Sequence, residues 1–111
     1  MDLTSFGLNE HILNGIIKVL KENPKVNEVI LFGSRAKGSF HAGSDIDLVL
    51  KGDNLELNDI LNLSIEIDKL DLPYKIDILI FDRITENSLV EHIIRVGICL
   101  YNKNTPVISY I

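Results

Sequence analysis

The chain has one cysteine and no long apolar run, and each shortage excludes a class of protein. Cys99 is the only cysteine among 111 residues, so no disulfide can form within the chain. Because it lies in the apolar run Ile98-Cys99-Leu100, we expect a small buried side chain and not a catalytic thiol. No apolar stretch approaches the length of a membrane span, and the N-terminus lacks a basic region followed by an apolar one. We therefore expect a soluble cytoplasmic protein that does not contact the membrane.

Basic residues are also in short supply. Eleven Lys and Arg residues against sixteen Asp and Glu residues give a formal net charge of −5. A protein that binds nucleic acid by itself normally needs a basic face, so direct nucleic-acid binding is not expected. The length is that of one domain, and 46% hydrophobic residues suffice for a modest core. We predict a single domain over 1–111, with its core at about 10–101 and a short tail over 102–111.

Apolar spacing predicts alternating helices and strands, which is typical of a single α/β unit. Helices are expected over 9–23 and 57–70, and a third begins at an apparent capping box, Ser88 to Glu91, and stops at Gly97. The apolar and β-branched runs predict strands over 26–32, 45–50, 75–81 and 98–101. The inward side of the second helix is predicted to consist of Leu57, Ile60, Leu61, Ser64, Ile67 and Leu70.

A glycine-containing turn follows the first predicted strand, in the segment Gly33-Ser34-Arg35-Ala36-Lys37-Gly38-Ser39. Gly33 allows the backbone to approach a phosphate closely, and the N–H groups after it are suited to anionic oxygens. The Ser34 hydroxyl can donate to a terminal phosphate, and Arg35 or Lys37 can neutralise a departing pyrophosphate. The spacing is not that of a Walker A motif. This turn is the predicted phosphate-binding half of a site.

Three aspartates supply the predicted other half. Asp45 and Asp47 open the next strand and point to one face, because side chains alternate along a strand. Carboxylates this close repel each other unless a cation lies between them, and their hard oxygens suit Mg²⁺. Asp77 is a lone acid in an apolar strand, where a charge is costly unless paired or metal-bound. If the two strands are neighbours, three carboxylates can hold two metal ions, with Asp77 also available as a base.

Each of these features also has an ordinary structural interpretation. A Gly-Ser turn, an Asp-x-Asp pair at a strand end, an acid on an edge strand and two surface cations are common when taken singly. Their combination in this order rarely arises by chance, which favours the functional interpretation. The histidines do not form a metal-binding pattern, and we expect ordinary surface or half-buried side chains at His11, His41 and His92.

The spacing from Gly33-Ser34 to Asp45-x-Asp47 resembles the signature of the nucleotidyltransferase superfamily that includes DNA polymerase beta. The small size and the segment from Phe32 to Ser39 look most like its minimal nucleotidyltransferase (MNT) branch. The resemblance covers about 10–101. It implies a mixed sheet of about four strands flanked by helices. It also implies metal ligation by Asp45, Asp47 and Asp77, with Asp77 as the base, and triphosphate contacts from Gly33 and Ser34.

The resemblance further implies an activity and a partner. Members transfer a nucleoside monophosphate from a nucleoside triphosphate to a hydroxyl, and many MNT proteins are antitoxins that add AMP to a tyrosine of a helical HEPN toxin. We accordingly expect ATP as substrate, two Mg²⁺ ions and a HEPN partner, in a homo-oligomer or a hetero-oligomer. Two alternatives stay open: a binding module that inhibits its partner by contact alone, and a nucleotidyltransferase that acts on a small molecule.

Overall fold

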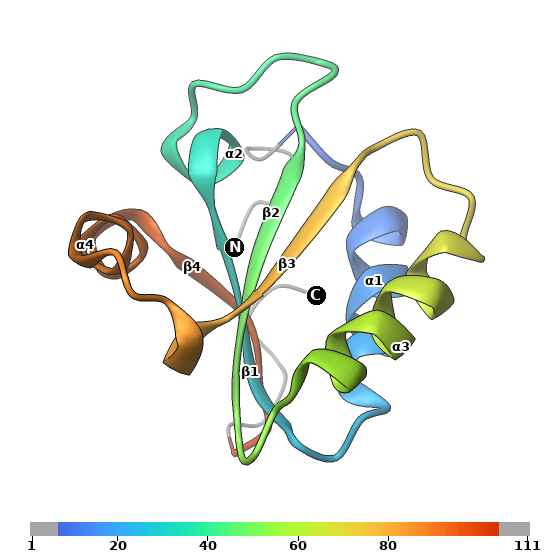
Figure 1. The fold of residues 1–111 in the computed structure, drawn as a ribbon. Helices are drawn as coiled ribbons and strands as arrows, with labels where there is room; N and C mark the ends of the chain where they lie inside the picture. Colours follow the sequence, from blue (N-terminus) through green and yellow to red (C-terminus); the bar gives the residue numbers. More distant parts are fainter. Residues whose placement is uncertain (1–6, 105–111) are drawn as a thin grey trace.

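The structure is a computed structural model, and it describes residues 7–104. Figure 1 shows helices on both sides of a single twisted sheet. Asn9 caps the first helix, because its side-chain oxygen accepts the Ile12 N–H at 2.8 Å. In chain order the elements are α1 (Glu10–Lys21), β1 (Val26–Phe32), α2 (Gly33–Lys37), β2 (Ile46–Gly52), α3 (Leu57–Asp68), β3 (Ile76–Ile80), η2 (Phe81–Arg83), α4 (Asn87–Val96) and β4 (Ile98–Asn102).

The sheet is mixed, as predicted, with the strand order β3-β2-β1-β4. β1 runs antiparallel to both β2 and β4, whereas β2 and β3 are parallel. A parallel pair needs a crossover connection, and α3 supplies it. The register places Asp47 of β2 opposite Asp77 of β3 and opposite Phe32 of β1. Asp47 and Asp77 therefore lie side by side on the neighbouring strands β2 and β3.

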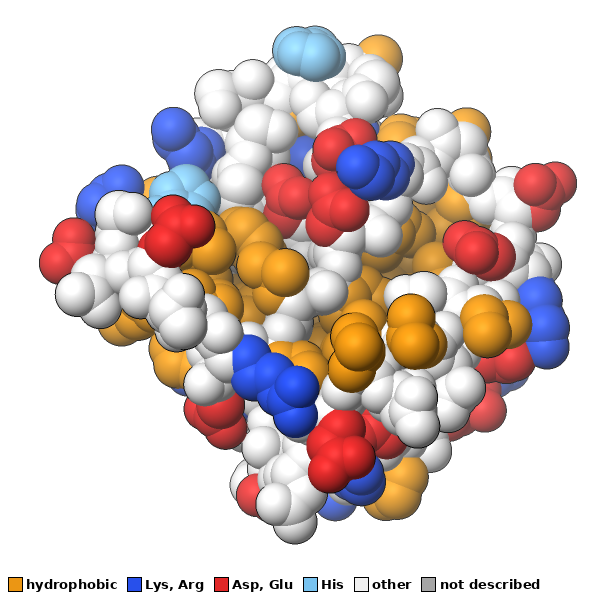
Figure 2. Space-filling view, in the orientation of Figure 1, with side chains coloured by type: hydrophobic (Ala, Val, Ile, Leu, Met, Phe, Trp, Pro, Cys, Tyr) orange, Lys and Arg blue, Asp and Glu red, His pale blue; other side chains and the backbone are white. Residues whose placement is uncertain are grey.

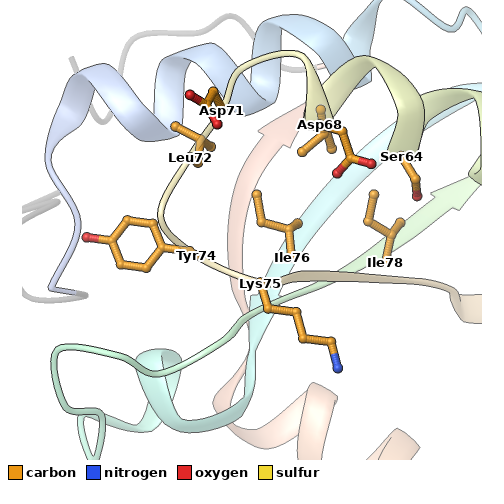
Figure 3. A pocket seen from close by; sticks show the side chains of 9 residues that line it. Ser64, Asp68, Asp71, Leu72, Tyr74, Lys75, Ile76 and Ile78 are labelled. Carbon is orange, nitrogen blue, oxygen red and sulfur yellow. The ribbon is translucent and has the colours of Figure 1, made fainter.

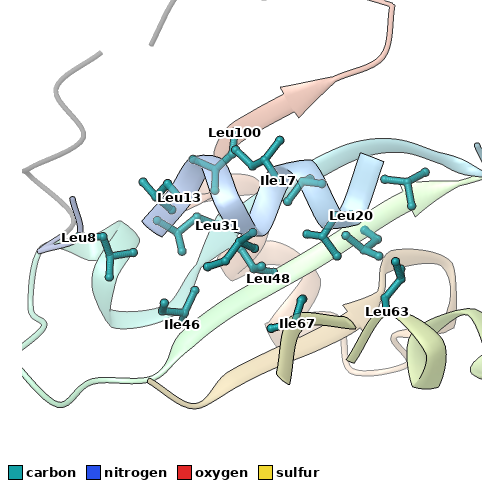
Figure 4. Packing of buried hydrophobic residues seen from close by; sticks show 14 of the residues in the cluster. Leu8, Leu13, Ile17, Leu20, Leu31, Ile46, Leu48, Leu63, Ile67 and Leu100 are labelled. Atoms are coloured by element: carbon teal, nitrogen blue, oxygen red, sulfur yellow. The ribbon is translucent and has the colours of Figure 1, made fainter. Parts of the chain in front are cut away.

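The main core lies between the sheet and the pair α1 and α3, which cover one of its faces (Figures 1 and 4). Leu20, Leu31 and Leu48 are fully buried there, each from a different element. Burying such a side chain contributes about 1.5–3 kcal/mol relative to leaving it exposed. A smaller cluster on the opposite face joins Val49 to Ile93 of α4. Both faces of the central strands are covered, which explains why β1 and β2 are so apolar.

The predicted inward side of α3 is wrong in part. Leu63 and Ile67 are the buried residues of this helix, whereas Leu57 and Leu61 are 61% and 51% exposed. Leu70, also predicted to point inward, lies beyond the end of α3 at Asp68 and is 36% exposed. The reason lies in the first turn of the helix. Asp59 accepts hydrogen bonds from Asn23 at 3.1 Å and from Lys25 at 3.0 Å, both in the segment before β1. These bonds hold the helix face that carries Asp59 against the rest of the domain. The neighbouring face, with Leu57 and Leu61, is therefore exposed to solvent.

The structure also differs from the sequence predictions at the start of α4 and at Cys99, and the predicted tail lies mostly outside the described residues. α4 begins at Asn87 with Glu86 as its N-cap, and no side chain caps it, so the capping box predicted from Ser88 is not formed. Cys99 is exposed and not buried, because β4 is an edge strand. The predicted tail begins inside β4, and its remainder over 105–111 lies outside the described residues. Within 7–104, no helix is long and apolar enough to cross a membrane.

Candidate functional site

The turn after β1 contains Gly33, the first residue of α2. Its φ of +76° lies in the left-handed region, which glycine adopts without strain. A Cβ added here would overlap Asp47 Oδ2 and would lie 3.1 Å from Asp47 Cγ. Gly33 is therefore needed for two reasons, the backbone conformation and the carboxylate that occupies the adjacent space. The turn and Asp47 form one tightly packed unit.

The three predicted acids lie together on the sheet face that α2 and α4 adjoin. Asp45 is exposed and Asp47 half-buried, whereas Ile46 and Leu48 between and after them are fully buried in the main core. This is the alternation that the sequence predicts. Burial raises the pKa of Asp47, and the negative charges of Asp77 and Asp45 raise it further. The three carboxylates are thus close enough to affect one another.

A basic side chain partly offsets this charge. Lys75 Nζ lies 3.8 Å from Asp77 Oδ1, and the positive charge of Lys75 lowers the pKa of Asp47, but less than burial and the neighbouring carboxylates raise it. Both partners of the Lys75–Asp77 pair are substantially exposed, so the pair is worth little energetically. Figure 2 shows acidic side chains gathered over the upper ends of β2 and β3, with a basic side chain beside them. The excess of negative charge at this position is what a cation would neutralise.

The acids do not form a closed metal site. In the part of the chain that the structure describes, no three His, Cys, Asp or Glu side chains are arranged to hold a metal ion together. Mg²⁺ nevertheless needs only one or two protein carboxylates, because water and substrate phosphates complete its shell. The carboxylate chemistry and the mutual repulsion at Asp47 fit a magnesium ion that is shared with a phosphate-bearing substrate. They do not support a site made by the protein alone.

Arg35 and Lys37, the two cations of the predicted phosphate turn, lie in different environments. Arg35 is 1% exposed and donates to the Ser44 carbonyl at 2.8 Å. Its guanidinium also lies over the rings of Phe40 and Tyr74, at 5.4 and 5.0 Å. Lys37 is exposed. This placement makes Arg35 the residue that holds the loop leading into Asp45, and it leaves Lys37 as the candidate for contact with pyrophosphate.

His92 belongs to the site, although the sequence predicts only an ordinary surface or half-buried side chain there. Its Nε2 accepts the Gly33 N–H at 3.2 Å, and its ring meets Phe32 edge-on with centroids 6.2 Å apart. The residue lies on α4, 59 positions away from Gly33. Nothing in the local sequence around His92 indicates this contact. Only the packing of α4 against the end of β1 brings the two together.

The cavity beside β3 is not lined by the three predicted acids. A cavity of about 330 Å³ lies between the end of α3 and β3 and is lined by Asp68, Ile76 and Ile78, among others. Figure 3 shows Ile76 and Ile78 pointing to one side of β3 and Lys75 to the other. Because Asp77 alternates with these isoleucines, it faces away from the cavity.

The strand order and the flanking helices are those of a nucleotidyltransferase domain. Residues 14–106 match the sequence profile of the family Polymerase beta, Nucleotidyltransferase, and the chain belongs to this family. The fold and family expected from the sequence are thereby confirmed.

Similar proteins include toxin–antitoxin components. A segment amounting to 44% of this chain is 49% identical to the protein adenylyltransferase MntA of Shewanella oneidensis, and it spans only about a third (34%) of that protein's length. A toxin–antitoxin crystal structure with AMP-PNP superposes with a TM-score of 0.68 at 28% identity, covering 83% of this chain and 74% of that one. An MntA-HpeT toxin–antitoxin variant superposes with the same TM-score at 26% identity, covering 87% and 75%. In that variant two aspartates separated by one residue are replaced by glutamate, and Asp45 and Asp47 have the same spacing.

Proposed function

We propose that this chain is a metal-dependent nucleotidyltransferase that transfers AMP from ATP to a hydroxyl, and that it acts as the antitoxin of a HEPN toxin. The observation that carries the proposal is the contact between the Gly33 turn and the Asp47 carboxylate, with Asp45 and Asp77 beside it. This contact places a backbone suited to phosphate next to carboxylates suited to Mg²⁺. Family membership and the similarity to MntA support the same chemistry.

Each residue has a distinct role in the proposed reaction. Asp45 and Asp47 hold magnesium, which when bound neutralises phosphate charge and lowers the pKa of the attacking hydroxyl. Asp77 is the third carboxylate and accepts the proton of that hydroxyl. The Gly33 backbone, Ser34 and Lys37 orient the triphosphate. The oxygen of the acceptor then bonds to the α-phosphorus, and the bond to pyrophosphate breaks.

A protein acceptor is favoured by the surface of α3. Leu57, Leu61 and Ile65 are 61%, 51% and 55% exposed and recur at every fourth position, so they form one apolar stripe. Figure 2 shows hydrophobic side chains at the surface over α3. A stripe with this spacing suits the apolar face of a partner helix. We assign it to the helical HEPN partner, by analogy with the toxin–antitoxin complexes to which this fold is similar.

The experiment is intact mass spectrometry of the HEPN partner that co-purifies with this chain. The partner is incubated with the chain, Mg²⁺ and each nucleoside triphosphate, and Asp47→Asn is the matched control. We expect the partner to gain the mass of AMP with ATP and the unmodified chain, and to gain nothing with Asp47→Asn. Transfer by the purified Asp47→Asn protein would contradict the assigned chemistry. A stable complex without any mass gain would favour inhibition by contact.

A further inference from the structure

His92 reaches the candidate site from α4, an element that supplies none of the predicted site residues. Its Nε2 accepts a hydrogen bond from the Gly33 amide at 3.2 Å. A ring nitrogen accepts a hydrogen bond only when it carries no proton, so this bond requires an unprotonated Nε2. The amide that it holds belongs to the residue that contacts Asp47. His92 therefore acts on the point where the phosphate turn and the carboxylates meet.

The imidazole ring is held in place by packing. The neighbouring residue Ile93 is 2% exposed and packs in the cluster with Phe32 and Val49, which fixes α4 against the sheet. The edge-on contact between His92 and Phe32, at 80° between the ring planes, restricts the ring further. A fixed acceptor is paired here with a glycine, the residue type whose backbone has the widest conformational freedom. The hydrogen bond selects one conformation of that glycine.

We propose that His92 is a positioning residue that fixes the Gly33-Ser34 turn in the conformation that receives the triphosphate. The inference rests on the proposed nucleotidyltransferase function and adds a residue to its site. Without the bond, the Gly33 peptide samples other orientations, and the turn that leads into Ser34 is no longer held against Asp47. One lost hydrogen bond corresponds to about a five- to tenfold weaker affinity.

Three variants separate positioning from packing. His92→Leu keeps an apolar side chain but removes the acceptor. His92→Gln places an amide oxygen within reach of the same amide and is the conservative rescue. His11→Leu is the matched control, because His11 is exposed on α1, on the other side of the sheet. Circular dichroism and thermal unfolding establish that each variant is folded before binding is compared.

Two readouts test the inference on the full chain. The first is the hydrogen-exchange rate of the Gly33 amide by NMR, which needs no nucleotide. The second is the dissociation constant for AMP-PNP in the presence of Mg²⁺. We expect His92→Leu to accelerate exchange and to weaken AMP-PNP binding five- to tenfold, with His92→Gln near the unmodified chain and His11→Leu unchanged.

The remaining outcomes are decisive as well. Unchanged AMP-PNP affinity in His92→Leu, with binding by the unmodified chain intact, overturns the inference and leaves the proposed function standing. Equal weakening in His92→Leu and His92→Gln also overturns it, since packing alone would then explain the effect. An unmodified chain that does not bind AMP-PNP overturns the proposed function, and this inference with it.

Discussion

Replacing Gly33 by alanine tests the packing of the phosphate turn against Asp47. Alanine in the left-handed region costs about 1–2 kcal/mol. The new methyl group must also displace the Asp47 carboxylate, and an overpacked contact costs about a further 1–3 kcal/mol. Rotating the carboxylate does not remove the problem, because Asp47 Cγ and Cβ also lie within 3.1 and 3.3 Å of the added carbon. The expected total loss of unfolding free energy is about 2–5 kcal/mol.

Gly38→Ala is the matched control for this prediction. Gly38 has a φ of +87° and no atom within 4 Å of an added Cβ, so its replacement carries only the backbone cost. Urea unfolding gives the loss of unfolding free energy in each variant. The loss in Gly33→Ala should exceed that in Gly38→Ala by about 1–3 kcal/mol, which is the cost of the contact with Asp47. The Asp47→Ala background should abolish that difference in a double-mutant cycle. Equal losses in Gly33→Ala and Gly38→Ala would refute the close packing of turn and carboxylate.

Three further changes test separate parts of the site. Burial and the neighbouring carboxylates raise the pKa of Asp47 above 3.8. Protonation of Asp47 therefore adds to the free energy of unfolding at low pH, and this stabilisation is lost as pH rises through the raised pKa. Asp47→Asn should therefore be more stable than the unmodified chain to urea at pH 7, an advantage that vanishes below pH 3.8; a loss at pH 7 would contradict this. Arg35→Lys should lower the free energy of unfolding by about 2–4 kcal/mol and speed proteolysis of the loop over 38–45. The reason is that lysine cannot donate the two guanidinium hydrogen bonds that Arg35 makes to the Ser44 carbonyl. Leu61→Asp should abolish pull-down of the HEPN partner and Ile94→Asp, 73% exposed on α4, should not; equal retention by both would remove the α3 stripe as the docking surface.

Much of the site follows from short-range patterns in the sequence. The alternation of Asp45 and Asp47 with buried residues, and the turn that begins at Gly33, depend only on local chain geometry. The meeting of Asp47 and Asp77 depends on which strands are neighbours, and the sequence could state this only as a condition. The parallel register of β2 and β3 fulfils that condition.

The buried face of α3, the burial of Arg35 and the contact of His92 could not be predicted, because they depend on contacts between residues far apart in the sequence. The apolar residues of α3 allow more than one inward face, and bonds from Asn23 and Lys25 to Asp59 select one. Arg35 resembles a surface cation in the sequence, but the loop before Asp45 and the Tyr74 ring enclose it. His92 contributes through a helix whose position depends on the packing of Ile93.

The proposal that the carboxylates and the Gly33 turn bind a metal and a triphosphate together underlies the whole proposed reaction. Calorimetric titration of AMP-PNP into the purified chain, with Mg²⁺ and then with EDTA, tests it most directly and needs no partner protein. We expect saturable binding that requires Mg²⁺ and is lost in Asp47→Asn. Binding that is equally tight in EDTA, or equally tight in Asp47→Asn, would contradict it.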